Sequence, residues 1–125
     1  MSMRIHSATV VVNDLDAAID FYLNTLGWTK DIDQPMGPEE RFVTVVPPGG
    51  GAELALGYPS WFGLDSAKGG ATGISITTYD IQADYDTLSG RGVRFKGPIE
   101  TMPWGDKATW FYDLDGNEFY LIQNQ

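Results

Sequence analysis

"FYDLDGNEFYLIQNQ", residues 111–125, predicts a β-hairpin. Its centre, Asp115-Gly116-Asn117, is typical of a tight turn, because Gly adopts left-handed backbone conformations without a steric penalty and Asn and Asp tolerate them. Aromatic and aliphatic residues lie on both sides of the turn, as they do in paired strands. We therefore expect one strand before the turn and a second strand that runs to the terminus.

The hairpin ends a series of elements that fills the second half of the chain, from about residue 71 to residue 123. "GISITTY", residues 73–79, predicts a strand, and Asp80 is placed to cap the helix that follows. That helix should stop near Gly92. "VRFKG", residues 93–97, predicts a short strand before the hairpin. The resulting order is one strand, one helix and then a further run of strands.

The first half, from about residue 4 to residue 57, has the same order. A strand at residues 6–12 precedes a helix that Asp14 should cap and Gly27 should end. A short strand near residues 28–32 then precedes a second hairpin. The helix carries an apolar stripe at helical spacing, which consists of Leu15, Ala18, Ile19, Tyr22 and Leu26.

The two halves repeat at a nearly constant offset. The matching positions are 65 to 67 residues apart: Asp14 and Asp80, Gly27 and Gly92, Glu53 and Tyr120. Repetition at one offset indicates two copies of one structural unit. We predict an α+β fold in which a single domain, residues 1–125, contains two tandem βαβββ modules joined by a link at about residues 58–70. Each helix should cover one face of its sheet, and the curled mixed sheets should surround a cavity.

The composition argues against several classes of function. The net charge of −9 makes nucleic acid an unfavourable partner, because binding to phosphates needs a basic surface. The chain has no cysteine, which excludes disulfides, thiolate metal sites and a cysteine nucleophile. No apolar run reaches the length of a membrane span, and the N-terminus lacks the pattern of a signal peptide. We expect a cytoplasmic protein with no membrane partner.

Two stretches resemble a known superfamily: "VVNDLDAAIDFYLNTLGW", residues 11–28, and "PWGDKATWFYDLDGNEFYLIQ", residues 103–123. They are similar to the strand–helix entry and the C-terminal hairpin of the vicinal oxygen chelate superfamily, which includes glyoxalase I, bleomycin-resistance proteins and extradiol dioxygenases. The resemblance covers essentially the whole chain and implies the same paired-module fold. It does not by itself imply a function, because this fold hosts several chemistries as well as plain binding proteins.

In the metalloenzymes of this superfamily, side chains from the first and last strand of each module bind one divalent metal ion. The matching positions here are Ser7, Glu53, Gly73 and Tyr120. Only Glu53 is a good metal ligand, since Gly73 has no side chain and hydroxyl groups bind divalent ions weakly near neutral pH. His6, the only histidine, should point to the opposite face from Ser7. The resemblance therefore implies a member with no metal and no other cofactor, closest in character to metal-free bleomycin-resistance proteins.

Glu53 and Tyr120 are the candidate catalytic residues. Partial burial in the cavity should raise the pKa of Glu53, which would let it act as a general base or hold the cationic nitrogen of a ligand. Alternatively, Glu53 forms a hydrogen bond with Tyr120 or Ser7 and only fills the place of the metal. Trp61 and Trp104 should add flat walls that suit a planar or cationic organic molecule. The predicted ligand-binding residues are Ser7, Glu53, Trp61, Trp104 and Tyr120.

These features favour a protein that binds a small organic ligand, cationic or aromatic, in a metal-free cavity, for example to sequester a drug. One alternative is a glyoxalase-like lyase, isomerase or dioxygenase that uses a divalent metal or proton transfer by Glu53 and Tyr120. A second alternative is a module for dimer packing with no active pocket. We also expect a homodimer, since pairing would cover the open apolar face that each curled sheet leaves.

Overall fold

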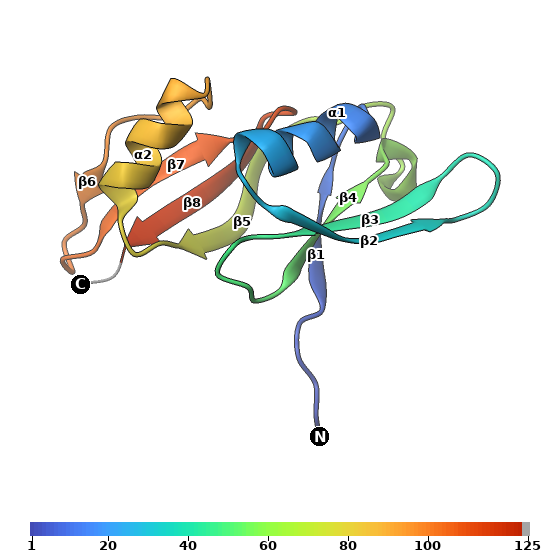
Figure 1. Ribbon diagram of the computed structural model, residues 1–125, viewed down its shortest axis with the longest axis horizontal. Helices are drawn as coiled ribbons and strands as arrows, with labels where there is room; N and C mark the ends of the chain where they lie inside the picture. The colour runs from blue at the N-terminus through green and yellow to red at the C-terminus, as the bar shows by residue number, and fades with distance from the viewer. Residues whose placement is uncertain (124–125) are drawn as a thin grey trace. The chain divides into compact units, whose positions relative to one another are not determined.

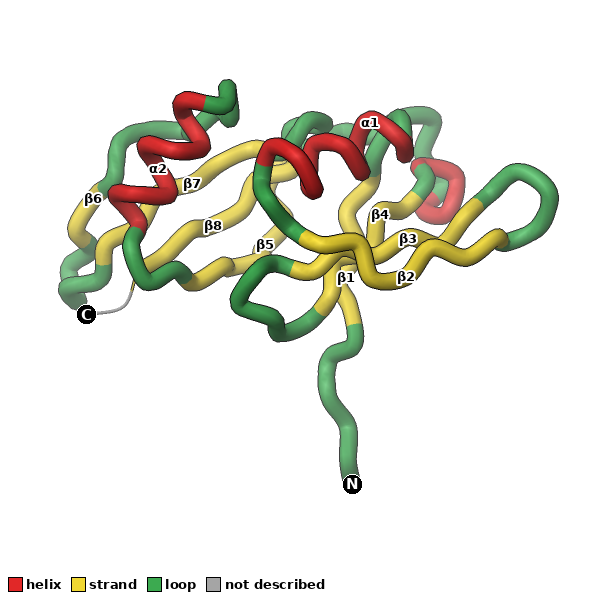
Figure 2. Tube along the Cα trace, viewed as in Figure 1, coloured by secondary structure: helices red, strands yellow, loops and turns green. Residues whose placement is uncertain are grey.

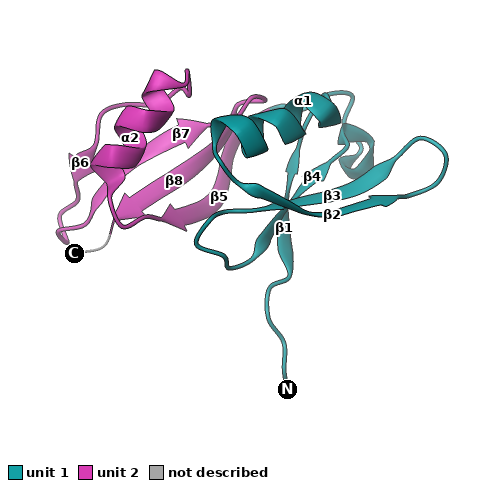
Figure 3. Ribbon diagram, viewed as in Figure 1, with its two compact units in different colours: residues 1–68 teal, residues 69–125 magenta. Residues whose placement is uncertain are grey.

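The structure, a computed structural model, describes residues 1–123. It contains two compact units, one of residues 1–68 and one that begins at Gly69 (Figure 3). Each unit holds a sheet and an α-helix (Figures 1 and 2). The elements in chain order are β1 (Ser7–Val11), α1 (Leu15–Asp20), η1 (Phe21–Thr25), β2 (Thr29–Pro35), β3 (Arg41–Val46), β4 (Glu53–Gly57), η2 (Pro59–Phe62), β5 (Gly70–Thr77), α2 (Ile81–Gly90), β6 (Glu100–Thr101), β7 (Lys107–Tyr112) and β8 (Asn117–Gln123).

Both units have the same sheet topology. Each contains one 4-stranded sheet, with the strand order β1-β4-β3-β2 in the first unit and β5-β8-β7-β6 in the second. The first strand of each unit pairs in parallel with the last, and all other pairs are antiparallel. These open, mixed sheets confirm the predicted α+β fold with two βαβββ repeats.

Both α-helices begin at the aspartates that the sequence predicts as caps. Asp14 Oδ1 accepts a hydrogen bond of 3.2 Å from the backbone N–H of Ala17. Asp80 Oδ1 accepts one of 3.0 Å from the backbone N–H of Ala83. Each carboxylate satisfies one of the N–H groups that a helix start leaves without a partner, and its charge complements the positive end of the helix dipole.

The sequence predicts one regular α-helix before Gly27, but the first helix is not regular along its whole length. After Asp20 it widens into the π-helical turn η1, in which the N–H of Leu26 donates to the carbonyl of Phe21 at 3.0 Å. Gly27 then ends it as predicted, with a φ of 78° that favours glycine. Among residues 1–123, no helix is both long and apolar enough to cross a membrane.

The strand prediction for residues 93–97 is wrong. Only Phe95 forms a bridge, to Phe111 on β7, and the fourth strand of this sheet is instead β6. The ladder breaks at Gly97-Pro98, because proline has no N–H to donate to a neighbouring strand. In the first unit, the strand expected near residues 28–32 is longer than predicted and becomes β2.

The core of each unit lies between its helix and one face of its sheet. α1 contacts β4, and α2 contacts β8. Strand β8 shows the two-faced pattern clearly, since Phe119 and Leu121 are buried while Glu118 and Tyr120 are only half-buried. Phe119 stacks on Phe111 of the neighbouring strand at a ring distance of 5.4 Å. The opposite face of the sheet therefore remains available for a site.

The hairpin turn of the second unit forms as predicted. The buried carboxylate of Asp113 accepts hydrogen bonds from the backbone N–H groups of Asp115 and Asn117 and from the side-chain amide of Asn117. Gly116 has a φ of 82°, the conformation for which glycine was expected. The second strand is described as far as Gln123, and the predicted extension to the terminus lies outside the described residues.

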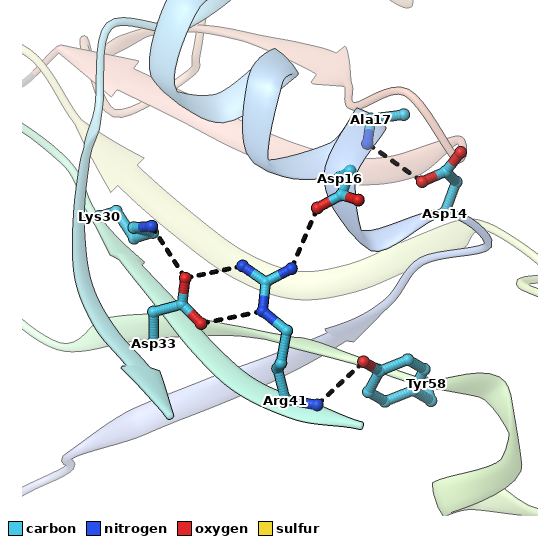
Figure 4. A network of polar contacts seen from close by, with 7 residues as sticks. All are labelled: Asp14, Asp16, Ala17, Lys30, Asp33, Arg41 and Tyr58. Carbon is cyan, nitrogen blue, oxygen red and sulfur yellow. Dashed lines mark hydrogen bonds and ion pairs between the residues drawn. The ribbon is translucent and has the colours of Figure 1, made fainter. Parts of the chain in front are cut away.

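In the first unit, a cluster of polar contacts around Arg41 connects β3 to its surroundings (Figure 4). The guanidinium group of Arg41 forms ion pairs with Asp33 on β2 at 2.7 Å and with Asp16 on α1 at 3.0 Å. Its backbone N–H donates to the hydroxyl oxygen of Tyr58, just before η2, at 3.0 Å. Lys30 also pairs with Asp33 at 2.8 Å. One arginine thus fixes a helix, an edge strand and a connection together.

Candidate functional site

The open face of the second sheet carries two rows of side chains that cross the strands β5, β8 and β7, which lie side by side (Figure 1). Residues that pair directly across strands point to the same face. Tyr120 pairs with Ser75 on one side and with Trp110 on the other, which makes the first row. Glu118 pairs with Ala71 and Tyr112 in the same way, which makes the second row.

The residues of these rows, apart from Tyr112, line the floor of a pocket of about 450 Å³. Three aromatic side chains, Trp104, Trp110 and Tyr120, contribute to its lining. The rings of Trp110 and Tyr120 lie 4.9 Å apart at a tilt of 48°. The described residues of the lining are Ala71, Gly73, Ile74, Ser75, Met102, Trp104, Trp110, Glu118 and Tyr120. The pocket is therefore mainly apolar and aromatic.

A loop between β6 and β7 supplies the outer wall. The N–H of Met102 donates to the carbonyl of Asp106 at 2.7 Å, which closes the loop into a tight turn. Trp104, at the tip, is 64% exposed, and its Nε1–H donates to Asp106 Oδ2 at 3.0 Å. The indole is thus held in position while much of its surface stays accessible to a ligand.

An irregularity in β5 shapes the floor of the pocket. Ala71 pairs with Glu118, and Ser75 pairs with Tyr120. Between these two pairs, β5 advances by four residues while β8 advances by two. Gly73 lies inside this bulge with a φ of 73°, and a Cβ added there would meet nothing within 4 Å. The hydroxyl of Thr72 donates to the carbonyl of Glu118 at 2.8 Å and holds the bulged segment in place. Gly73 leaves space over the floor because it has no side chain.

Among the residues 1–123 that line the pocket, Glu118 is the one carboxylate, and it has a cation as a partner. Lys96 Nζ lies 3.6 Å from Glu118 Oε2 and 5.7 Å from the centre of the Trp110 ring. The side chain of Glu118 is 14% exposed and that of Lys96 is 58% exposed. Glu118, Trp110 and Met102 are not among the ligand-binding residues predicted from the sequence. Strand alternation could have indicated Glu118, which stands two residues before Tyr120 and therefore on the same face.

Around Glu53, the open face of the first sheet is polar. Ser7 pairs directly with Glu53, so the two residues lie on the same face of the sheet, as predicted. Thr44, from the neighbouring strand β3, donates a hydrogen bond of 2.6 Å from its hydroxyl to Glu53 Oε1. The same Thr44 oxygen accepts a hydrogen bond of 3.0 Å from the N–H of Ile32. Thr44 is completely buried, so this short chain of hydrogen bonds fixes the position of the carboxylate.

The prediction that the pKa of Glu53 is raised is wrong. The hydrogen bond from Thr44, followed by one from Asp31, lowers the pKa of Glu53 below its ordinary value and outweighs the opposing effect of desolvation. The pKa of Asp31 moves upward instead, first because of the hydrogen bond to Glu53 and then because of the negative charge of Glu53. Asp31 is therefore the carboxyl group of this pair that holds a proton more readily.

Trp61 belongs to a different cluster from Trp104. It lies in η2 of the first unit, where its ring is 5.3 Å from that of Tyr58 and its Nε1–H donates to Glu40 Oε1 at 3.2 Å. Gly57 makes room for this packing, because a Cβ there would lie 3.1 Å from the Trp61 ring. The second-unit pocket is thus lined by Trp104 and Tyr120, whereas Ser7, Glu53 and Trp61 are all residues of the first unit.

Strand pairing also corrects the match between the two units. Ser7 pairs with Glu53 in the first unit, and Ala71 pairs with Glu118 at the corresponding place in the second. Glu118 is therefore the counterpart of Glu53 in the sheet, although the sequence comparison assigned that place to Tyr120. The bulge around Gly73 changes the register of β5 by two residues, so that Ala71 and not Gly73 is the partner of Glu118.

The donors at the family's metal positions do not fit a divalent ion. Glu53 already accepts a hydrogen bond from Thr44, Gly73 offers no side chain, and Ser7 and Tyr120 offer only hydroxyl groups. Across residues 1–123, the structure has no group of three or more His, Cys, Asp or Glu side chains that could hold a metal ion.

Comparisons with known proteins agree with this geometry. The family model for the Glyoxalase/Bleomycin resistance protein/Dioxygenase superfamily matches residues 4–121. The structure of a superfamily member from Sphaerobacter thermophilus DSM 20745 is similar, with 52% identity, a TM-score of 0.92 and 98% of each chain covered. TnmS3, an antibiotic binding protein from Streptomyces sp. CB03234, has 34% identity and a TM-score of 0.84, with 99% of this chain and 98% of TnmS3 covered. The uncharacterized protein YetH of Bacillus subtilis (strain 168) is 33% identical over 97% of this chain and 98% of its own length.

Proposed function

The chain belongs to the Glyoxalase/Bleomycin resistance protein/Dioxygenase superfamily, and we propose that it binds a small organic ligand, aromatic or cationic, in the pocket of its second unit without a metal. The role of such binding would be sequestration of the ligand. Trp104, Trp110 and Tyr120 would contact its flat faces, and Glu118 and Ser75 would offer hydrogen-bonding groups at the floor.

This proposal rests on the size of the second-unit pocket together with the side chains that line it. A volume of about 450 Å³ lies in the range of small-molecule sites, and three aromatic side chains converge on it. Aromatic rings bury large areas of a planar ligand and prefer offset or tilted contacts. A surface pocket of this kind exposes apolar area to water. A bound ligand would cover that apolar area.

The similarity to an antibiotic binding protein supports binding more than catalysis. TnmS3 shares 34% of its residues with this chain over nearly the whole length of both. The lowered pKa of Glu53 makes that carboxylate a weaker base, which argues against the alternative of proton transfer by Glu53 and Tyr120. Ser7, Glu53 and Trp61 remain predicted ligand contacts of the first unit. A homodimer in the cytoplasm also remains part of the proposal.

Titration with phenanthridine, an uncharged planar tricycle, tests the proposal. We expect saturable quenching of tryptophan fluorescence, and calorimetry should give the same affinity. Trp110→Leu should weaken binding by about tenfold, since it removes an aromatic contact. Trp28→Phe is the matched control, because Trp28 packs on Tyr22 in the first unit and should leave the affinity unchanged. Absence of saturable binding, or equal affinities in wild type and Trp110→Leu, would count against the pocket.

A further inference from the structure

We propose that Lys96 sets the charge preference of this pocket. Its ammonium group lies beside Trp110 and Glu118, at the place where the cationic group of a ligand would otherwise bind. The pocket therefore selects planar aromatic ligands that carry no charge. This inference rests on the proposed function and narrows its ligand class from aromatic or cationic to aromatic and neutral.

The backbone brings Lys96 to the pocket. The N–H of Lys96 donates to the carbonyl of Trp110 at 2.8 Å, and the N–H of Tyr112 donates to the carbonyl of Arg94 at 3.0 Å. Residues 94–96 therefore run alongside β7 for a short distance, with the bridge between Phe95 and Phe111 at the centre. Lys96 thus extends the row that contains Trp110 and Tyr120, and its side chain lies on the same face of the sheet.

The ammonium group of Lys96 lies beside the two groups that would attract a cationic ligand. The negative face of an indole attracts an ammonium group within about 6 Å of the ring centre, and Lys96 Nζ lies 5.7 Å from that of Trp110. The same Nζ is 3.6 Å from the carboxylate of Glu118. A ligand cation would have to displace Lys96 from both groups, whereas an uncharged ring would not.

Glu118 would be a strong cation site without this lysine. Its side chain is only 14% exposed, so water screens its charge weakly compared with that of a surface carboxylate. Arg94 lies against a different ring, with its guanidinium carbon 5.0 Å from the centre of the Tyr112 ring. Tyr112 is not part of the pocket lining, whereas Trp110 and Glu118, the two groups beside Lys96, both belong to it.

A matched pair of probes measures this charge preference. Phenanthridine is neutral, and N-methylphenanthridinium has the same ring system with a permanent positive charge. We expect wild-type protein to bind phenanthridine more tightly. In Lys96→Met, affinity for the cation should rise by about tenfold while affinity for phenanthridine changes by less than about threefold. The side chain of Lys96 is 58% exposed, so the variant should fold normally, which thermal unfolding verifies.

Two further variants separate the local effect from that of net charge. Lys107→Met removes one positive charge from the same sheet but lies outside the pocket lining, and it should leave the ratio of the two affinities unchanged. Adding Glu118→Gln to Lys96→Met should abolish the gain for the cation. The inference is overturned if Lys96→Met and Lys107→Met shift the ratio equally, or if wild-type protein prefers the cation. If neither probe binds any variant, the proposed function fails as well; if phenanthridine binds and only the ratio is unaffected, the proposed function stands without this inference.

Discussion

At the scale of single residues, the pKa of Glu53 depends on one hydroxyl group. Thr44 donates to Glu53 at 2.6 Å and is the main cause of the lowered pKa of this carboxyl. The ionised form of Glu53 therefore stabilises the folded state above the pKa of the unfolded chain. This contribution is lost as the pH falls through the folded-state pKa, because protonation removes the charge that the hydrogen bond favours.

We predict that Thr44→Val moves the pKa of Glu53 upward, toward its ordinary value of about 4.3. Carbon-13 NMR titration of the side-chain carboxyl groups measures this directly. Thr9→Val is the matched control, since Thr9 lies on the same face but pairs with Ala55. An unchanged Glu53 titration in Thr44→Val would contradict the assignment of Thr44 as the main cause.

Tyr120 allows a second prediction at this scale, because its ring and its hydroxyl can be removed separately. Tyr120→Phe keeps the ring that lies 4.9 Å from Trp110 and should weaken phenanthridine binding by less than about threefold. Tyr120→Leu removes the aromatic contact and should weaken it by about tenfold. Tyr112→Phe, outside the pocket lining, serves as the control in the same fluorescence titration. Equal losses in both Tyr120 variants would assign the contribution to the hydroxyl instead.

At the scale of elements, Arg41 joins α1, β2 and the residue before η2 (Figure 4). Hydrogen bonds from Arg41, and then from Lys30, hold the pKa of Asp33 far below its ordinary value. The ionised Asp33 therefore stabilises the fold above the pKa of an unfolded aspartate, about 3.9. As the pH falls below that value toward the folded-state pKa, this contribution disappears.

We predict that Arg41→Met lowers the free energy of unfolding at pH 7 and that the difference from wild type becomes smaller as the pH falls below about 4. Urea unfolding at several pH values measures both effects. Arg91→Met gives a control with the same change of net charge at the C-cap of α2, in the other unit. A difference from wild type that stays constant with pH would mean that Arg41 acts through packing and not through Asp33.

At the scale of the whole molecule, the open face of the second sheet leaves aromatic side chains exposed to water. Trp110 and Tyr120 are only half-buried, and Trp104 is 64% exposed, within one contiguous pocket. Exposed apolar surface of this kind favours either a ligand or a second protein chain. We expect a homodimer, with light scattering giving twice the chain mass of 13.7 kDa at micromolar concentration. A monomer mass throughout a dilution series would contradict this expectation.

The sequence by itself determined the order and the ends of most elements. Asp14, Asp80 and Gly27 act locally, because capping and left-handed turns involve residues only a few positions apart. The turn at Gly116 forms for the same reason. The lining of the pocket includes Trp104 and Tyr120, which loop position and strand alternation were enough to predict. Their role in binding stays a prediction.

Tertiary structure alone decided the contents of the site. Gly73 lies in a bulge of β5, so that Ala71 and not Gly73 pairs with Glu118, the counterpart of Glu53 in the second sheet. Thr44 reaches Glu53 from a neighbouring strand and reverses the expected direction of its pKa shift. Lys96 meets Trp110 and Glu118 only because a short segment pairs with β7. All three depend on strand register, which contacts between distant residues set and which local sequence patterns do not encode.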